Sequence, residues 1–260
     1  MLGLYDSGLG GLTVLAALRR AGIDQDVVYF ADQAHVPYGD RTDAELYALL
    51  GENFALLEAH RVDAVVMACN TSCAVADRRG GFPVTAVPVL DLIGNAAAAL
   101  RGSSLRRVAV FATAATVRSG AYRRAIAARA PHIDVVEIAA PQLVPIVERG
   151  LAGSDTARDA VAQLLRALPP GIEAIVYGCT HYPLLDGHFA AALAPHVVRI
   201  DPAEAQAAQA AALVRSLALP PGGSRTHYLT SGDVASFRAN VRAWTSDRSA
   251  TFASTQVIAS

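Results

Sequence analysis

Short runs of β-branched and other apolar residues alternate along the chain with longer stretches that are rich in alanine and leucine. Continuous apolar runs of this length are typical of strands buried on both faces, and the longer stretches have the length and composition of helices. The predicted strands are Leu2–Tyr5, Val27–Phe30, Ala64–Met67, Val108–Phe111, Val135–Ile138, Ala174–Tyr177 and Val197–Ile200. The predicted helices include Thr13–Ala21, Ala44–His60, Ser119–Ala130 and Ser154–Ala167. Buried strands separated by helices indicate parallel βαβ units and therefore an α/β fold.

The two halves of the chain repeat this pattern. Residues 62–71 align without a gap with residues 172–181, which places Cys69 and Cys179 at equivalent positions. Two further pairs of segments align in the same order, residues 26–31 with 134–139 and residues 2–7 with 108–113. The repeat predicts two similar three-layer α/β lobes with mostly parallel sheets. A pseudo-twofold duplication would relate them, with the active site in a small, polar cleft between them.

The end of the repeat suggests where the lobes divide. The second copy ends before Asp201, so we expect residues 1–96 together with 206–260 to form the first lobe. Residues 97–205 then form the second lobe.

Composition restricts the class of protein. With 53% hydrophobic and 17% charged residues, global disorder is excluded. The net charge of −1 offers no general electrostatic attraction for nucleic acid or for an anionic membrane. No apolar run reaches the roughly 18 residues of a membrane span, and the first residues lack the basic segment of a signal peptide. Three cysteines are too few for a disulfide framework, so we expect a soluble cytoplasmic protein with free thiols.

The chain contains no lysine, and its basic residues other than histidine are all arginine. Pyridoxal phosphate enzymes bind their cofactor as a lysine Schiff base, and a Walker A loop requires a Gly-Lys pair. Both kinds of site are therefore excluded.

Cys69 and Cys179 each follow a predicted buried strand directly. Ligands of parallel sheets bind at the carboxyl ends of the strands, where free N–H groups and the helix dipole favour anions and lower a thiol pKa. Two thiols on facing lobes can approach one small ligand from opposite sides. The alternative is that both are buried structural cysteines, which are common. The duplicated placement favours chemistry.

A zinc site is a competing interpretation, with Cys69, Cys73, Cys179 and His181 as ligands. The spacings differ from those of the usual zinc sites, and the neighbouring hydroxyl and amide side chains suit a carboxylate better. We therefore predict no metal and interpret Cys73 as a packing residue. A phosphatase-type loop is disfavoured because no arginine follows either active-site cysteine within the turn.

The first predicted strand leads into a glycine-rich loop, Asp6–Thr13. Its glycines allow close backbone approach, and Ser7 with the loop N–H groups can hold an anion. The glycine spacing is a weak match to a dinucleotide-binding motif. A carboxylate at Asp6 would repel a phosphate and favours a ligand that carries an ammonium group, although a helix-capping role for Asp6 or Ser7 is compatible with this.

Seven segments resemble, in order along the chain, the motifs of cofactor-independent glutamate racemases. They are Asp6–Val14, Pro37-Tyr38-Gly39, Ala68–Thr71, Thr113–Ser119, Leu143–Glu148, Gly178–Leu185 and Thr230–Asp233. The resemblance extends from residue 3 to about residue 236, and its most specific motif is the Gly178–Leu185 run.

Five positions depart from the usual residues of that family. Ala31 and Ala112 stand where glycine is usual, His35 replaces a common arginine, Cys73 a common serine, and Asp91 a common glycine. These departures affect the conformation of the loops and the fine selectivity for the substrate. Every catalytic residue of the family's motifs is present at its matching position.

The resemblance implies a racemase that interconverts L- and D-glutamate without a cofactor and supplies D-glutamate for bacterial peptidoglycan and cell shape. One thiolate removes the α-proton, and the opposite thiol returns a proton to the other face. By resemblance, Cys69 acts on the D-enantiomer and Cys179 on the L-enantiomer. Because no cofactor delocalises the carbanion, oriented donors must stabilise a planar anionic transition state in a site that excludes water.

The resemblance also assigns supporting roles. Asp6 contacts the substrate ammonium group or adjusts the protonation of Cys69. His181 assists Cys179 in proton transfer, and Glu148 orients His181. The alternative for His181 is a buried polar residue without a catalytic role. The implied substrate-binding residues are Asp6, Ser7, Tyr38, Gly39, Asn70, Thr71, Thr113, Thr116, Thr180 and His181.

Two other functions stay open at this stage. The chain could be an aspartate or other acidic amino-acid racemase of the same superfamily, or a non-catalytic amino-acid-binding regulatory protein. The expected partner is a small-molecule substrate, with no nucleic acid and no membrane. The sequence leaves the oligomeric state open, with a homodimer as one candidate.

Overall fold

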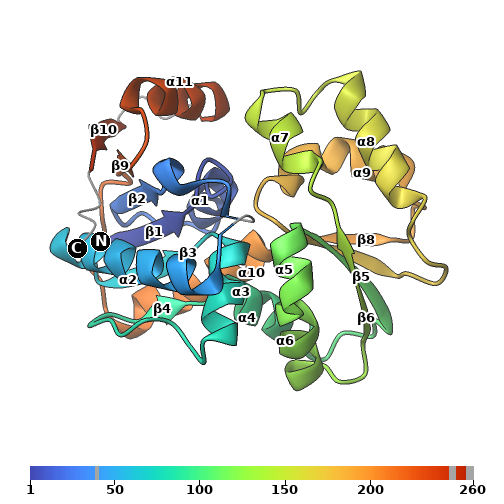
Figure 1. Cartoon of the computed structure of the whole chain (residues 1–260). Helices are drawn as coiled ribbons and strands as arrows, with labels where there is room; N and C mark the ends of the chain where they lie inside the picture. Colours follow the sequence, from blue (N-terminus) through green and yellow to red (C-terminus); the bar gives the residue numbers. More distant parts are fainter. Residues whose placement is uncertain (39–40, 246–249, 256–260) are drawn as a thin grey trace.

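The computed structural model describes residues 1–38, 41–245 and 250–255, and its strands form two separate sheets (Figure 1). The strands are β1 (Leu2–Asp6), β2 (Val27–Ala31), β3 (Ala64–Met67), β4 (Val89–Leu90), β5 (Arg107–Ala112), β6 (Asp134–Ala139), β7 (Ala174–Gly178), β8 (Val198–Ile200), β9 (Thr226–Thr230) and β10 (Thr251–Ser254). The first sheet has the order β10-β9-β2-β1-β3-β4, and the second has the order β6-β5-β7-β8. Every pairing between these strands is parallel, so the predicted α/β fold with parallel sheets is confirmed.

Helices connect the strands and cover both sheets. They are α1 (Leu12–Arg20), α2 (Asp43–Ala59), α3 (Asn70–Arg78), α4 (Leu92–Ala99), α5 (Ala114–Ser119), α6 (Ala121–Arg129), α7 (Leu143–Glu148), α8 (Asp155–Leu165), α9 (Asp186–Ala192), α10 (Pro202–Ser216) and α11 (Val234–Trp244). Two short 3-10 turns, η1 (Gln33–His35) and η3 (Tyr182–Leu185), follow β2 and β7. In the part of the chain that the structure describes, no helix is long and apolar enough to cross a bilayer.

The predicted strands all overlap observed ones, and the predicted helix Ser119–Ala130 corresponds to α6, which begins two residues later than predicted. Ser119 instead ends α5, because Gly120 adopts φ +66° and separates α5 from α6. A residue in the left-handed conformation cannot continue an α-helix, and glycine takes that conformation without steric cost. The strands β4, β9 and β10 were not predicted.

The internal repeat appears in the strand pairing. The order β2-β1-β3-β4 in the first sheet corresponds to β6-β5-β7-β8 in the second. The residues that align in the sequence also pair alike: Leu2 pairs with Val27 and Ala64, and its counterpart Val108 pairs with Val135 and Ala174. The carboxyl ends of β3 and β7, where the two cysteines follow, are therefore equivalent places in the two sheets.

Alternate residues of each strand face different cores. In β1, Leu2 and Leu4 pack with α1 and α10, whereas Tyr5 packs on the other face against α2. In β5, Phe111 packs with the α7–α9 side, and Val110 faces the opposite core. Both sheets are thus covered on both faces, as parallel sheets require.

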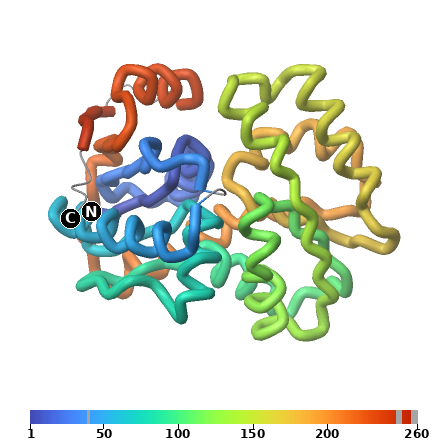
Figure 2. Tube along the Cα trace, in the orientation of Figure 1, coloured from blue at the N-terminus to red at the C-terminus, as the bar shows by residue number. Residues whose placement is uncertain are grey.

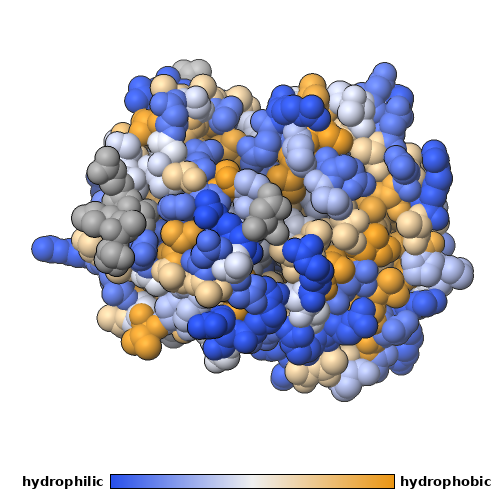
Figure 3. All heavy atoms as spheres, in the orientation of Figure 1, coloured by the Kyte–Doolittle hydropathy of each residue, from blue (hydrophilic) through white to orange (hydrophobic). Residues whose placement is uncertain are grey.

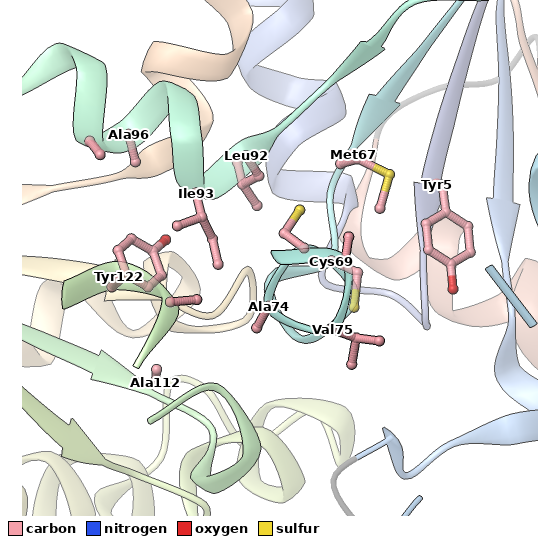
Figure 4. Close-up of a cluster of buried hydrophobic side chains, with 14 of the residues drawn as sticks. Tyr5, Met67, Cys69, Ala74, Val75, Leu92, Ile93, Ala96, Ala112 and Tyr122 are labelled. Carbon is pink, nitrogen blue, oxygen red and sulfur yellow. The ribbon is translucent and has the colours of Figure 1, made fainter. Parts of the chain in front are cut away.

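One of these cores is common to the two lobes. It joins Tyr5 and Met67 of the first sheet to Val110 of the second through α3, α4 and α6. Figure 4 shows part of it, with Tyr122 of α6 near Ile93 of α4. The lobes are therefore fused by apolar packing on this side, and polar residues meet elsewhere between them.

The first and last parts of the described chain belong to the same lobe. In Figure 2 the first and last parts of the described chain lie together, and the middle part forms the other half. The expected boundaries near residues 96 and 206 fall inside α4 and α10 and stay a prediction.

Candidate active site

Asp6 is the last residue of β1 and begins the glycine-rich loop. Its carboxylate accepts a 2.7 Å hydrogen bond from the Gly11 N–H, which folds the loop back over the strand end. Asp6 is buried, and this burial raises its pKa above the usual value. The positive charge of His181 and the loop N–H groups act in the opposite direction and favour the carboxylate.

Cys69 lies between β3 and α3, at the N-terminal end of the helix. Its Sγ lies 3.6 Å from the Oγ of Ser7, to which it donates a hydrogen bond. Burial and the neighbouring Asp6 raise the pKa of Cys69 to about 11, although hydrogen bonds with Ser72 and Ser7 partly oppose this shift. Cys69 is therefore a protonated thiol at neutral pH, in the position of a proton donor.

Cys179 follows β7 at the equivalent turn of the second lobe and belongs to a chain of three side chains. Its Sγ lies 3.6 Å from His181 Nδ1, and His181 Nε2 lies 2.5 Å from Glu148 Oε1 at the end of α7. Burial alone would lower the pKa of His181, but Cys179 and Glu148 outweigh it and raise that pKa well above its usual value. The arrangement favours an imidazolium at His181, which lies between the Glu148 carboxyl group and the Cys179 sulfur.

The glycine-rich loop of the first lobe packs against the Cys179 turn of the second. A Cβ at Gly10 would lie 2.4 Å from Thr180 Oγ1 and 2.6 Å from His181 Nδ1, so only glycine fits. The Thr13 hydroxyl donates a 3.1 Å hydrogen bond to the carbonyl of Thr180. The same loop holds Ser7 against Cys69. One loop therefore borders both cysteine turns.

A second contact between the lobes consists of three threonines. Thr71 Oγ1 at the start of α3 lies 3.3 Å from Thr113 Oγ1 and 3.4 Å from Thr116 Oγ1 at the start of α5. Thr113 also caps α5, because its hydroxyl accepts a hydrogen bond from the Thr116 N–H. These hydroxyls can turn from one another to a ligand.

Asn70 provides a buried donor beside Cys69. Its Oδ1 accepts a 2.7 Å hydrogen bond from the Tyr122 hydroxyl of α6, which fixes the orientation of the amide. Its Nδ2 finds no acceptor among the described residues. A buried amide donor without a partner costs free energy, so this group is suited to a ligand oxygen.

Tyr38 belongs to a buried hydrogen-bond network, and its predicted contact with the substrate stays a prediction. Its hydroxyl donates a 2.6 Å hydrogen bond to Asp32 and lies 2.6 Å from the Tyr5 hydroxyl, inside the first lobe. This hydroxyl is therefore occupied by a structural network. Gly39, the neighbouring predicted substrate-binding residue, lies outside the described residues.

The sequence analysis missed the centre of that network, Asp32. This carboxylate is fully buried and is hydrogen-bonded to His35 Nδ1 at 2.7 Å and to the Ser231 hydroxyl at 2.8 Å. Its position gave a signal, because Asp32 directly follows β2 as Asp6 ends the neighbouring β1. The network fixes the chain that leads from β2 toward the cleft.

Cys73 is one of the four ligands of the competing zinc interpretation. Within the described ranges, no group of three or more His, Cys, Asp or Glu residues is arranged to hold a metal ion. Cys73 is buried beside Asp91, and burial with this carboxyl raises the pKa of Cys73 well above its usual value. Asp91 itself caps α4 through the Ile93 N–H at 3.1 Å, which accounts for an aspartate at this position.

Comparison with known proteins gives a consistent result. Residues 13–210 match the family described as Asp/Glu/Hydantoin racemase. The glutamate racemase of Gloeobacter violaceus is 43% identical over 256 residues, which covers 94% of this chain and 92% of that protein. The crystal structure of glutamate racemase from Thermus thermophilus in complex with β-chloro-D-alanine has a TM-score of 0.85 at 36% identity, and the match covers 98% of this chain and 96% of that one. The glutamate racemase of Francisella tularensis in complex with D-glutamate has a TM-score of 0.89 at 26% identity, covering 100% and 98% of the two chains.

Proposed function

The chain belongs to the Asp/Glu/Hydantoin racemase family, and from that premise we propose that it is a glutamate racemase with a two-thiol mechanism. One observation carries the mechanism. The thiols of Cys69 and Cys179 stand at equivalent strand ends of two lobes, and a single loop borders both turns. A planar carbanion held between two such thiols can be deprotonated on one face and protonated on the other.

The proposed reaction begins with different roles for the two thiols. The raised pKa of Cys69 keeps it protonated as the acid, and Cys179, whose sulfur lies 3.6 Å from His181 Nδ1, is the proposed base. With L-glutamate bound, the Cys179 thiolate takes the α-proton and Cys69 donates its own proton to the opposite face. The enzyme is then left with a thiolate at Cys69 and a thiol at Cys179, the state that accepts D-glutamate.

The Cys69 thiolate formed in this way must be stabilised without a histidine partner. Asp6 lies close enough to raise the pKa of Cys69, so a carboxylate there opposes the thiolate. The substrate ammonium group, placed next to Asp6, supplies the compensating positive charge. This arrangement explains why an aspartate is useful beside a thiol that must ionise only when substrate is present.

The carbanion must be stabilised by donors that are already in place. The unpaired Nδ2 of Asn70 and the hydroxyls of Thr71 and Thr180 are candidates, because all three residues are buried at the ends of β3 and β7. Preorganised donors in a site without bulk water are worth more than the same donors in solution. Glu148 acts through His181 by holding the imidazole in place for Cys179.

In the cell, we propose that this activity supplies D-glutamate for peptidoglycan synthesis in the bacterial cytoplasm. The partner is the small-molecule substrate, and neither nucleic acid nor a membrane is required. A homodimer is the proposed assembly, to be tested by light scattering during size-exclusion chromatography.

Circular dichroism of L-glutamate incubated with the protein tests the activity directly. Loss of the optical signal to the racemic value without added cofactor supports the proposal. A signal that stays constant while calorimetry detects glutamate binding would instead identify a binding protein. A parallel incubation with aspartate separates the two acidic amino-acid racemases.

The mechanism also predicts which treatments leave the activity intact. Dialysis, chelators and hydroxylamine should have no effect, because the proposed chemistry uses two thiols and no metal or carbonyl cofactor. Loss of activity on chelation would favour the zinc interpretation. Cys73→Ser should be nearly silent in turnover, since this side chain faces Asp91 rather than the Cys179 turn.

A further inference from the structure

Tyr122 lies on α6, and its side chain is completely buried. The ring packs in the apolar core that joins the two lobes, near Ile93 of α4 (Figure 4). Figure 3 shows hydrophilic side chains gathered over the junction of the lobes, so the surroundings of the ring differ from the surface above it. A phenylalanine would fill the same apolar space, and the packing of the ring therefore does not explain the hydroxyl group.

The hydroxyl of Tyr122 donates a 2.7 Å hydrogen bond to Asn70 Oδ1. This bond connects the two lobes, because Asn70 begins α3 after the first sheet's β3, whereas α6 lies between β5 and β6 of the second sheet. Burial and the nearby Cys73 and Asp91 raise the pKa of Tyr122 well above its usual value. The hydroxyl therefore keeps its proton and remains a donor throughout the physiological range of pH.

A permanent donor at this place determines which end of the Asn70 amide faces Tyr122. The carbonyl oxygen accepts the hydrogen bond, so the NH₂ group lies at the other end of the amide. A half-turn of the amide would bring the NH₂ group to the Tyr122 hydroxyl and leave the hydroxyl proton without this acceptor. A buried donor without an acceptor costs free energy. Tyr122 therefore selects one of the two orientations of the amide.

The NH₂ end of this amide is available to a ligand. Asn70 is buried, and its Nδ2 has no acceptor among the described residues. Asn70 follows Cys69 directly and is the first residue of the nine-residue helix α3. The first N–H groups of a helix have no partner within it and favour an anion, and the Thr71 hydroxyl lies in the same turn. These donors together suit the carboxylate of an amino acid whose α-carbon lies next to Cys69.

The orientation of the amide matters most during proton transfer. Removal of the α-proton moves negative charge onto the carboxylate oxygens, and a donor that is already in place stabilises this charge. A carbonyl oxygen in the place of the NH₂ group would repel it. Because the interaction strengthens as the charge develops, it contributes to kcat more than to KM.

We propose that Tyr122 is a positioning residue for racemisation, whose hydroxyl reaches from the second lobe and holds the Asn70 amide with Nδ2 toward the α-carboxylate of glutamate. Tyr122 does not touch the substrate and acts only through Asn70. The bond also makes this donor depend on the placement of the second lobe, because a separation of α6 from α3 would release the amide. The inference rests on the proposed racemase function for its substrate.

Tyr122→Phe gives the first test, since it removes one oxygen atom and keeps the ring. We expect kcat to fall about tenfold with KM nearly unchanged, less than the roughly 100-fold loss typical of deleting such a donor, because a released amide still adopts the correct orientation part of the time. Ile126→Val is the matched control, because Ile126 is fully buried in the same helix and its truncation weakens the same core. Both variants should unfold at lower urea concentration than the wild type, but the control should keep the wild-type kcat.

A double variant tests whether Tyr122 acts through Asn70. Asn70→Ala should lower kcat about 100-fold. Adding Tyr122→Phe to that variant should cause no further loss, because no amide remains to be oriented. A further tenfold loss in the double variant would overturn the inference, as would a kcat in Tyr122→Phe equal to that of Ile126→Val.

Nuclear magnetic resonance of the Asn70 side-chain amide gives a test that needs no turnover. The two proton signals of the ¹⁵N-labelled NH₂ group are identified by their absence from the spectrum of Asn70→Ala. Saturating glutamate should move one of them downfield in the wild-type protein, because Nδ2 gains an acceptor. This shift should be lost in Tyr122→Phe and kept in Ile126→Val.

The outcomes distinguish the inference from the proposed function. A shift with glutamate that requires Tyr122, in a protein without racemase activity, would support the positioning role and refute the proposed function. An Asn70 amide that glutamate does not shift, in an active racemase, would overturn the positioning role and leave the proposed function standing. A shift of the same size in Tyr122→Phe as in the wild type would also overturn the positioning role.

Discussion

Replacing Gly10 by alanine should damage the active site by adding a single carbon atom. The new Cβ would lie 2.4 Å from Thr180 Oγ1 and 2.6 Å from His181 Nδ1. Ordinary contacts of this kind require about 3.4 Å or more, so the loop and the Cys179 turn must separate by about 1 Å. Both sides are held by the fold, since Thr13 binds the Thr180 carbonyl and Glu148 binds His181.

The expected loss of activity is large compared with the loss of stability. A displacement of about 1 Å in a catalytic arrangement can lower the rate about 100-fold, so kcat/KM should fall by one to two orders of magnitude. Overpacking of this size costs about 1–3 kcal/mol of folding free energy. Because the two enantiomers have equal free energy in solution, kcat/KM must fall by the same factor in both directions. This equality is an internal check on the measurement.

The assay is racemisation followed by circular dichroism from each enantiomer, together with urea unfolding. Gly187→Ala is the matched control: Gly187 lies in α9, and its Cβ would meet nothing within 4 Å. That control should keep full activity and gain about 0.5–1 kcal/mol of stability, as glycine-to-alanine changes in helices do. A fully active Gly10→Ala enzyme would refute the packing of this loop on the Cys179 turn.

Four other substitutions test the roles of individual groups. Cys69→Ser and Cys179→Ser should each abolish racemisation, but with an analogue whose leaving group traps the carbanion the first should still process the L-form and the second the D-form; the opposite pattern would reverse the assignment of the faces. Glu148→Gln should lower kcat for L-glutamate about 10- to 100-fold and move the basic limb of its pH profile to lower pH, because it removes a group that raises the pKa of His181; an unchanged limb would exclude this role. Burial raises the pKa of Asp201 to about 6, so its contribution to stability is present below pH 4 and is lost as the pH rises through 6. Asp201→Asn, which keeps the α10 cap, should therefore stabilise the protein by up to about 3 kcal/mol above pH 6 and hardly at all near pH 4 in urea unfolding; equal effects at both values would contradict the linkage.

The sequence predicted the parts of the fold that depend on apolar pattern. Runs such as Ala64–Met67 are buried on both faces, so their composition identifies them as strands. β9, with the sequence THYLT, mixes polar and apolar residues, and β4 has only two residues. Such strands are specified by the neighbours with which they pair, and a local pattern cannot predict them.

The candidate site was predictable because the repeat placed two cysteines at equivalent strand ends. The contacts across the lobes were not, since Gly10 against His181 and Thr71 against Thr113 join residues far apart in the chain. Tyr38 shows the same limit, because its motif does not reveal that its hydroxyl donates a hydrogen bond to the buried Asp32. A motif identifies which residues matter, and only the packing shows which atoms are available.

Racemisation of L-glutamate in D₂O tests the central claim most directly. The thiols exchange their protons with solvent, so the two-thiol account requires removal of protium by one cysteine and delivery of deuterium by the other. The D-glutamate formed in the first turnovers should carry deuterium at Cα, while the remaining L-glutamate keeps its protium. Product that retains the original hydrogen, or substrate that gains deuterium as fast as the product forms, would show a single base acting on both faces and contradict the account.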